Sequence, residues 1–420
     1  MIDIKLIRES PEAVRENLKK RNEPALLKLL DSAIKLDATR RALIKETEAL
    51  KQKKNEITRE IAAKKSKAAL QKAGRIGAEI KKKDEELAEA DEKTRLALMN
   101  IPNMLHESVP RGKDDTDNVV VRSEGKLKFS FEPKNHADIA TALEMLDEER
   151  AAKVAGSGFY YLTGKLALLD MALQRYALDM LVKRGFTPVQ PPLMMRRKPY
   201  EGAVSLGEFE SVMYKIDSDD LYMIATSEHS MAAMRMDEII NESELPIKLA
   251  GVSPCFRREI GAHGKYTRGI FRVHNFNKVE QFVFCAPEDS WKMHEELQKN
   301  SEEILRNLGI AFRVVNVCTG DIGSIAAKKY DIEFLMADGH YREIGSNSNC
   351  TDYQARRLSI RYREKEGTAV KGFVHTLNNT ALATSRAMVA ILEQFQQGDG
   401  SVRIPKALHG YCGFTKIEKE

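Results

Sequence analysis

Residues 256–276 read FRREIGAHGKYTRGIFRVHNF, and apolar segments lie on both sides of this stretch. The alternation of apolar residues predicts strands over 248–259 and 269–284. Seven basic or histidine side chains lie in or beside the connection: Arg257, Arg258, His263, Lys265, Arg268, Arg272 and His274. An antiparallel hairpin would hold its arginines at a fixed separation, and planar guanidinium groups bind phosphate oxygens in pairs. A solvated basic loop explains the same pattern, so both interpretations stay open here.

The composition indicates a large globular chain. With 420 residues, 42% of them hydrophobic and 31% charged, we expect two domains with a sizeable core. The formal net charge of +5 is too small for a general DNA-coating protein. The sequence contains no uninterrupted apolar run of about eighteen residues and no leader-like start, which predicts a cytoplasmic protein without a membrane span. Five dispersed cysteines without a CxxC pair favour reduced thiols over a zinc site.

The N-terminal quarter has heptad periodicity. Leucine or isoleucine recurs every seven residues at Leu29, Leu36, Leu43, Leu50 and Ile57, which predicts one seam of a long helix. A looser second pattern consists of Leu70, Ile76, Ile80, Leu87 and Leu96, and Pro102 follows it. A reversal near residues 64–66 would make the two helices an antiparallel coiled-coil hairpin about 50 Å long.

The outer half of this predicted arm is strongly basic. Residues 51–83 contain twelve Lys or Arg against three Asp or Glu, so their net charge is +9. A solvated coiled-coil surface and a polyanion-binding surface both fit this charge, and its concentration towards the tip favours the polyanion.

The rest of the chain is predicted to mix strands and helices. Residues 101–118 are rich in Pro, Gly and Asp and are predicted to be a linker between a domain over 1–100 and a domain over 119–420. Further strands are expected at 312–317, 331–335 and 372–377, and helices at 166–184, 288–308 and 384–396. This order lacks the regular alternation of a parallel α/β sheet. There is also no P-loop motif, so other groups would have to hold the phosphates of a nucleotide.

Three motifs suggest a family. RGFTPVQPPLM (184–194) resembles motif 1 of the class II aminoacyl-tRNA synthetases. The opening stretch resembles motif 2, with its Phe-Arg-x-Glu and Arg-x-His-x-Phe sequences. TLNNTALATSRAMVAILEQFQ (376–396) resembles motif 3 and places Arg386 in the first turn of a helix, where a cation opposes the helix dipole.

Within this class, the chain is most similar to the seryl-tRNA synthetase family. IATSEHSMAAM (224–234) holds a Thr-x-Glu loop, and FNKVEQF (276–282) holds the glutamate that contacts serine in the family. EIGSNSNCTDYQARR (343–357) resembles its Glu-x-x-Ser segment, and DGSVRIPKAL (399–408) follows motif 3 in the family's order. The resemblance covers nearly the whole chain.

The resemblance implies an α+β fold: an N-terminal antiparallel coiled-coil hairpin, then a class II core of mainly antiparallel sheet flanked by helices. It implies a homodimer that uses ATP and Mg²⁺ to form seryl-adenylate from L-serine, and then transfers the seryl group to the 3′ end of tRNA(Ser). The implied ATP-binding residues are Arg257, Arg258, Glu259, Arg272, Val273, Phe276, Glu343, Ile344, Gly345, Ser346 and Arg386. Among them, Arg257 and Arg386 would be catalytic, and Glu343 and Ser346 would ligate the metal.

The implied serine-binding residues are Thr226, Ser227, Glu228, Glu280 and Thr380, and the implied tRNA-binding residues are Lys53, Lys54, Lys64, Lys65 and Lys67. Asn379 replaces a glycine of the family pattern, which puts fine selectivity against threonine in doubt. Two alternatives stay open: an amino-acid:carrier-protein ligase, and an inactive synthetase-like binding protein. The long arm argues against the first, and the presence of Arg257, Glu280 and Arg386 argues against the second.

Overall fold

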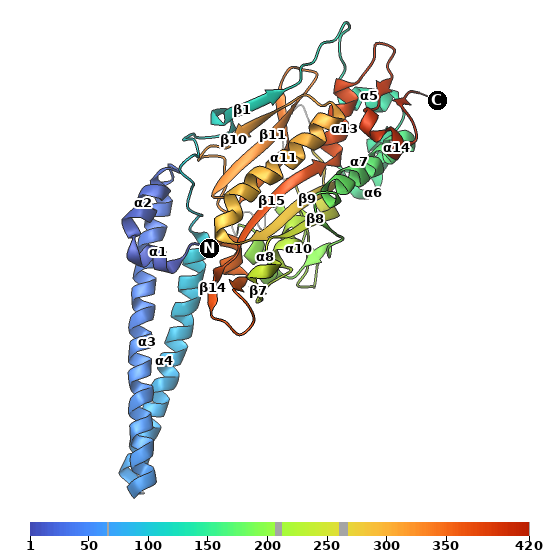
Figure 1. Cartoon of the computed structure of the whole chain (residues 1–420). Coiled ribbons are helices and arrows are strands. Elements are labelled where there is room, and N and C mark those ends of the chain that lie inside the picture. Colours follow the sequence, from blue (N-terminus) through green and yellow to red (C-terminus); the bar gives the residue numbers. More distant parts are fainter. Residues whose placement is uncertain (65–66, 206–211, 260–267, 420) are drawn as a thin grey trace. The chain divides into compact units, whose positions relative to one another are not determined.

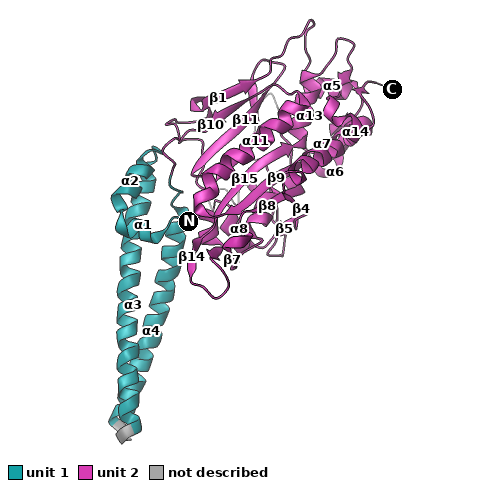
Figure 2. Ribbon diagram, in the orientation of Figure 1, with its two compact units in different colours: residues 1–104 teal, residues 105–420 magenta. Residues whose placement is uncertain are grey.

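The computed structural model describes residues 1–64, 67–205, 212–259 and 268–419. It divides into two compact units, residues 1–104 and residues 105–420 (Figure 2). Within the part of the chain that is described, none of the helices combines the length and the hydropathy needed to cross a membrane.

The first unit is helical and confirms the predicted hairpin. Two short helices, α1 (Ile4–Glu9) and α2 (Pro11–Lys19), precede two long ones, α3 (Pro24–Lys64) and α4 (Lys67–Asn100), which lie side by side (Figure 1). At 1.5 Å per residue, the 41 residues of α3 span about 60 Å. Pro11 occupies the first position of α2, where its missing N–H leaves no hydrogen bond unmade.

The seam of the arm differs in part from the predicted one. Ile57, Ile76 and Ile80 are buried between the two helices, as the heptads predict. Leu70 and Leu96 are 56% and 40% exposed, so these two predicted seam positions are wrong. The small side chain of Ala69 packs in this cluster instead of Leu70.

The base of the arm is a separate small core. Val14 and Leu18 of α2 pack with Leu30 and Ala33 of α3. Arg8 binds the buried Asp37 through both of its oxygens, at 2.6 and 2.8 Å, and this hydrogen bonding holds the pKa of Asp37 below its ordinary value. The turns at the base of the arm are therefore part of a folded body. Towards the tip, the described residues of α3 and α4 pack against each other.

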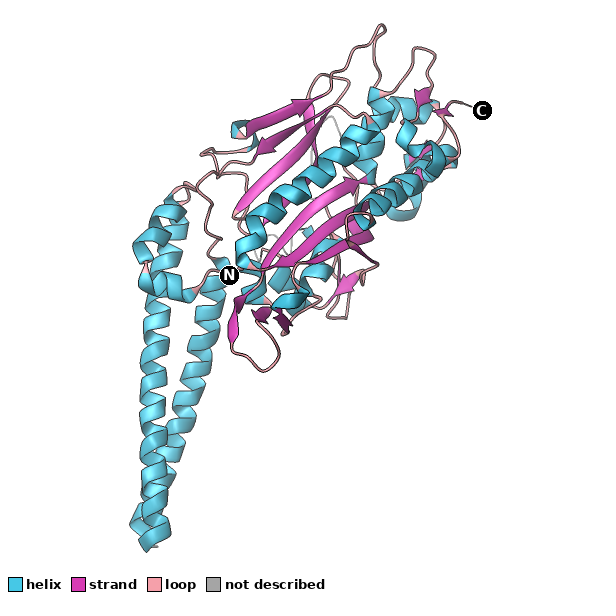
Figure 3. Cartoon of the chain, viewed as in Figure 1, coloured by secondary structure: helices cyan, strands magenta, loops and turns pink. Residues whose placement is uncertain are grey.

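The second unit is built on an eight-stranded sheet (Figure 3). Its order is β1 (Val119–Glu124), β10 (Phe312–Asn316), β11 (Lys328–Leu335), β12 (Tyr341–Asn349), β15 (His375–Ala383), β9 (Asn275–Cys285), β8 (Ile247–Phe256) and β4 (Thr187–Val189). Only the edge pair β4 and β8 is parallel among these described strands. The smaller sheets are formed by β2 (Leu146–Asp147) with β3 (Tyr161–Leu162), β5 (Met194–Met195) with β6 (Tyr222–Met223), β16 (Val402–Arg403) with β17 (Lys416–Ile417), and β7 (Ile239–Asn241) with β13 (Arg361–Arg363) and β14 (Val370–Phe373).

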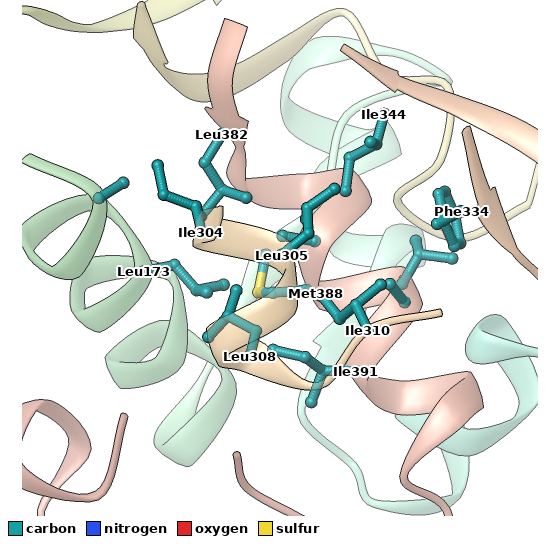
Figure 4. Close-up of a cluster of buried hydrophobic side chains, with 14 of the residues drawn as sticks. Leu173, Ile304, Leu305, Leu308, Ile310, Phe334, Ile344, Leu382, Met388 and Ile391 are labelled. Atoms are coloured by element: carbon teal, nitrogen blue, oxygen red, sulfur yellow. The ribbon is translucent and has the colours of Figure 1, made fainter. Parts of the chain in front are cut away.

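Helices cover both faces of the large sheet. The larger hydrophobic core lies between one face and α7 (Gly164–Val182), α11 (Ser290–Leu308) and α13 (Thr384–Gln394), and Figure 4 shows Leu173, Leu305 and Met388 meeting there. A second core, around Tyr200 and Phe282, involves α8 (Arg197–Ala203), α10 (Ser227–Ala233) and α12 (Tyr353–Arg357). The remaining helices are α5 (His136–Ala142), α6 (Glu148–Ala155), α14 (His409–Cys412), η1 (Asp115–Asp117), η2 (Glu242–Glu244), η3 (Pro287–Asp289) and η4 (Lys406–Leu408).

The structure corrects two predicted strands. The strand expected from residue 269 begins at Asn275, because Gly269 has a φ of +82° and its N–H donates to Glu148 at 2.9 Å instead of joining a ladder. The segment 372–377 contains the end of β14 and the start of β15 rather than one strand. The strand β12 was not predicted, because its polar residues lack an apolar alternation.

Candidate active site

The strand β9 sorts its side chains onto the two faces of the large sheet. Phe276, Lys278 and Glu280 are alternate residues, and each lines at least one of two neighbouring cavities. Gln281 points the other way and donates from Nε2 to the Leu297 carbonyl of α11 at 3.3 Å. Because alternate residues in a strand are about 7 Å apart, a molecule lying along β9 would meet an aromatic ring, a cation and a carboxylate in turn.

The first cavity has a volume of about 460 Å³. Its lining includes four of the five predicted serine-binding residues, together with both predicted metal ligands: Thr226, Glu228, Glu280, Thr380, Glu343 and Ser346. Residues 226, 280, 343 and 380 come from four segments that are distant in sequence, so the fold of the sheet brings them together.

Glu228 is held at the wall of this cavity by α10. Thr226 caps the helix by accepting a hydrogen bond from the Glu228 N–H at 3.2 Å. The carboxylate accepts from Asn378 Nδ2 at 3.0 Å and from Gln354 Nε2 at 3.3 Å. Burial, and next the charge of Glu280, raise the pKa of Glu228 to about 7.

Glu280 carries a buried ion pair. Lys278 Nζ lies 2.5 Å from its Oε2, and the side chains of Lys278 and Glu280 are 7% and 1% exposed. The Thr380 hydroxyl donates to the same oxygen at 3.5 Å. Burial raises the pKa of Glu280, and the Lys278 ammonium opposes this rise.

The second, narrower cavity collects most of the predicted ATP-binding residues. Its lining includes Arg257, Glu259, Arg272, Val273, Phe276, Glu343, Ile344, Gly345 and Arg386. The Arg257 guanidinium lies 5.4 Å from the centre of the Phe276 ring. Gly345 is required by close packing, because a Cβ there would lie 2.8 Å from the Cβ of Thr380.

Arg386 and Glu343 contact each other in the lining of the second cavity. Arg386 Nη1 donates to the Glu343 carbonyl at 2.9 Å and lies 3.3 Å from its carboxylate. Burial opposes ionisation of Glu343, but the charges of Arg386, Lys329 and Arg257 hold its pKa below the ordinary value. In this structure, the anion beside Arg386 at the helix start is therefore the Glu343 carboxylate.

Asp331 is a site residue that the sequence did not indicate. Its Oδ1 accepts a hydrogen bond from the Ser346 hydroxyl at 2.5 Å across the β11–β12 pair. Burial, and also the charge of Glu343, raise the pKa of Asp331 to about 7. Only the pairing of residue 331 with residue 346 could have revealed it, and β12 had not been predicted.

Three residues singled out in the sequence lie outside the linings of both cavities. The Ser227 side chain is fully buried and lies outside the first cavity, against Gly251. Arg258 lines neither cavity. Asn379 points to the opposite face of the sheet, where its Nδ2 donates to Leu297 O at 2.6 Å and Ser301 Oγ at 2.9 Å, so it does not narrow the first cavity. His263 and Lys265 lie outside the described residues.

The second unit, with its antiparallel sheet and two arginine-lined cavities, has the features of a class II aminoacyl-tRNA synthetase core. A sequence profile of the tRNA synthetase class II core domain (G, H, P, S and T) matches residues 212–395, and one of the seryl-tRNA synthetase N-terminal domain matches residues 1–105. The chain is 54% identical to the serine–tRNA ligase of Methanospirillum hungatei JF-1 over 418 residues, 98% of each chain.

Solved structures agree with these sequence matches. The seryl-tRNA synthetase of Pyrococcus horikoshii, complexed with ATP, superposes with a TM-score of 0.95 at 47% identity over 100% of both chains. The cytoplasmic serine–tRNA ligase of Naegleria fowleri, in complex with AMP, gives 0.89 at 37% identity over 100% of this chain and 99% of that one. The chain belongs to the seryl-tRNA synthetase family. Neither alternative, the carrier-protein ligase or the inactive binding protein, is supported.

Proposed function

We propose that the chain activates L-serine with ATP and transfers the seryl group to tRNA(Ser). The observation that carries this proposal is the wall between the two cavities. Arg257, Lys278, Glu343 and Thr380 line both of them, so molecules bound in each would meet at cationic side chains. In the reaction, a serine carboxylate oxygen bonds to the α-phosphorus of ATP, the bond from that phosphorus to the bridging oxygen breaks, and pyrophosphate leaves.

Serine binds in the first cavity under this proposal. Glu280 and Thr226 hold its ammonium group, Glu228 adds a second carboxylate to that end, and the Thr380 hydroxyl lies near the serine hydroxyl. A site built to hydrogen-bond a hydroxyl rejects alanine, because its own polar groups would stay unpaired. The serine carboxylate is already ionised at neutral pH, so no general base is needed, and catalysis consists of positioning and charge stabilisation.

ATP binds in the second cavity. Phe276 stacks on the adenine ring, Glu259 accepts from its amino group, and Arg272 and Arg386 hold the outer phosphates. Arg257 stabilises the charge that develops on the α-phosphate. Since the Arg257 guanidinium now lies over the Phe276 ring, adenine binding would free it to turn towards the phosphate.

The residues present fit a Mg²⁺ ion beside these phosphates. Glu343 and Ser346 offer a carboxylate and a hydroxyl, and the buried Asp331 lies within hydrogen-bonding distance of Ser346. Mg²⁺ binds few protein oxygens and completes its shell with phosphates and water. Bound there, the ion would neutralise charge on the leaving pyrophosphate.

The arm supplies tRNA binding, and the catalytic unit supplies the dimer interface. Lys53, Lys54 and Lys64 belong to the C-terminal part of α3, and Lys67 begins α4. Lys65 lies outside the described residues. The segment 185–194 contributes Pro191, Pro192 and Met194 to the lining of an apolar hollow of about 450 Å³, which Met234 also lines. We propose that this face joins two copies of the chain.

Serine-dependent exchange of pyrophosphate into ATP tests the proposed activity. We expect exchange with serine and at least about a hundredfold less with alanine, because the Thr380 hydroxyl would be left unpaired. A folded protein that gives no serine-dependent exchange would overturn the proposal. Charging of tRNA(Ser) by the same preparation tests the second step.

A further inference from the structure

We infer that Lys278 is a further catalytic residue: serine's ammonium displaces it from Glu280, and its own ammonium then moves to the serine carboxylate and α-phosphate. This inference rests on the proposed function and assigns a role to a residue that the sequence motifs had left without one. The following observations carry it.

The position of Lys278 on β9 is intermediate. It lies between Phe276, which faces the second cavity, and Glu280, which faces the first, and it lines both. The bond between serine and the α-phosphate has to form between these two ends. A long, flexible side chain in this place reaches either one.

The ion pair with Glu280 conflicts with serine binding. Lys278 occupies Oε2 of Glu280 at 2.5 Å, and the Thr380 hydroxyl approaches the same atom. The serine ammonium needs this carboxylate, and two ammonium groups at one oxygen repel each other. On this inference, Lys278 leaves Glu280 when serine binds.

The substrates offer the displaced ammonium a favourable destination. Glu343 and Arg386 are already paired with each other at 3.3 Å. The serine carboxylate and the α-phosphate bring new negative charge to the junction of the cavities, beside Arg257. The ammonium group moves as a whole, so the step requires no proton transfer, and the only bonds changed are those of adenylate formation.

Binding measurements on the unaltered protein test the displacement. The probe is the α,β-methylene analogue of ATP, which cannot release pyrophosphate. Serinol carries serine's ammonium and hydroxyl without a carboxylate, whereas glycerate lacks the ammonium. We expect serinol to raise the affinity for the ATP analogue at least about fivefold, the lower end of typical coupling between sites, and glycerate to leave it unchanged. No effect of serinol, or an equal effect of glycerate, overturns the inference.

The variant Lys278→Gln tests the catalytic role. Glutamine keeps a hydrogen-bond donor for Glu280 but removes the charge. We expect the coupling by serinol to vanish and kcat for pyrophosphate exchange to fall about a hundredfold, with the KM for serine unchanged or lower. A purely structural ion pair predicts the reverse, a raised KM with kcat preserved, and that result overturns the inference. If serinol still couples in a folded Lys278→Gln, the ligand's own charge is the cause and the inference also fails.

Lys248→Gln is the matched control. Lys248 lies on β8, pairs with Glu296 at 2.6 Å and lines neither cavity, so both kinetic constants should stay as they are. Serine-dependent exchange by the unaltered protein is measured first. Its absence would refute the proposed function itself, whereas normal exchange with an unaffected Lys278→Gln refutes only the role of Lys278.

Discussion

Each of three cations in the active site lies against a protein group that a substrate would replace or approach. Arg257 covers the Phe276 ring, Arg386 binds Glu343, and Lys278 binds Glu280. These contacts limit the cost of holding buried charges before substrates bind, since an unpaired buried charge is strongly destabilising. Under the proposed function, substrate anions would replace the carboxylates beside Lys278 and Arg386, and adenine would take the place of Arg257 on the Phe276 ring.

Arg257→Ala should lower the rate of adenylate formation about a hundredfold or more, the usual effect of removing one charge-stabilising donor. Single-turnover formation of seryl-adenylate measures this rate. Arg306→Ala is the control, because Arg306 pairs with Glu124 at 2.7 Å and lines neither cavity. A near-normal rate in a well-folded Arg257→Ala would show that Arg257 does not serve the α-phosphate.

Serine binding should depend on pH through Glu228. Its pKa is raised to about 7, so the carboxyl group is neutral below this pH and charged above it. A neutral carboxyl group attracts an ammonium weakly, and we therefore expect kcat/KM for serine to fall as the pH drops from 8 to 6. The profile of pyrophosphate exchange checks this, and Glu228→Gln should lower activity and remove the slope. The same slope in Glu228→Gln would assign the titration to another group.

The raised pKa also predicts a stability effect. A carboxyl group with a higher pKa in the folded state stabilises the fold below its unfolded pKa and loses this contribution as pH rises through the folded value. Glu228→Gln should therefore gain stability relative to the unaltered protein at pH 8 but not at pH 4, by up to about 3 kcal/mol. Urea unfolding at the two pH values measures the difference, and an equal effect at both would contradict the assignment.

At the scale of elements, the sequence predicted the hairpin arm, the antiparallel core and the family, because heptads and linear motifs are local signals. It did not predict that this segment is the strand β12, since polar residues such as Ser346 and Asn347 lack an apolar period. Asp331 was missed for that reason. The wrong expectation for Asn379 has the same origin. The face of the sheet on which a side chain lies depends on the strand register, and a shift of one residue moves it to the opposite face.

The segment 185–194 should form a dimer interface. Met194 is 41% exposed on the rim of an apolar hollow, and a glutamate there would place a charge in the interface. We expect Met194→Glu to sediment as a monomer at micromolar concentration while the unaltered protein sediments as a dimer. Val154→Glu is the control, because Val154 is 74% exposed on α6 and outside this surface. A monomeric unaltered protein would remove the basis of the proposal.

At the scale of the whole molecule, shortening the arm should impair transfer to tRNA and leave adenylate formation intact. Arg40 binds Asp91, and Lys51 binds Asp84 at 2.9 Å, so the arm can be shortened between paired positions. Because α1 and α2 pack on its base, we would remove residues 45–86 and join Ile44 to Leu87 with a short Gly/Ser linker. Pyrophosphate exchange should stay largely unchanged, since every residue proposed to bind serine or ATP is in the second unit.

Transfer to tRNA(Ser) by this shortened chain should fall steeply through lost affinity, because the removed segment contains all of residues 51–83, whose net charge is +9. In the full-length chain, replacing Lys53 and Lys54 by Gln should reduce the slope of log affinity against log salt concentration by about two, one for each phosphate contact. Lys28 and Lys35, exposed near the base of α3, give a control with the same change of charge and an unchanged slope. If the shortened chain charges tRNA(Ser) as well as the intact one, the arm has a role other than tRNA binding, and the basic tip is a solvated surface after all.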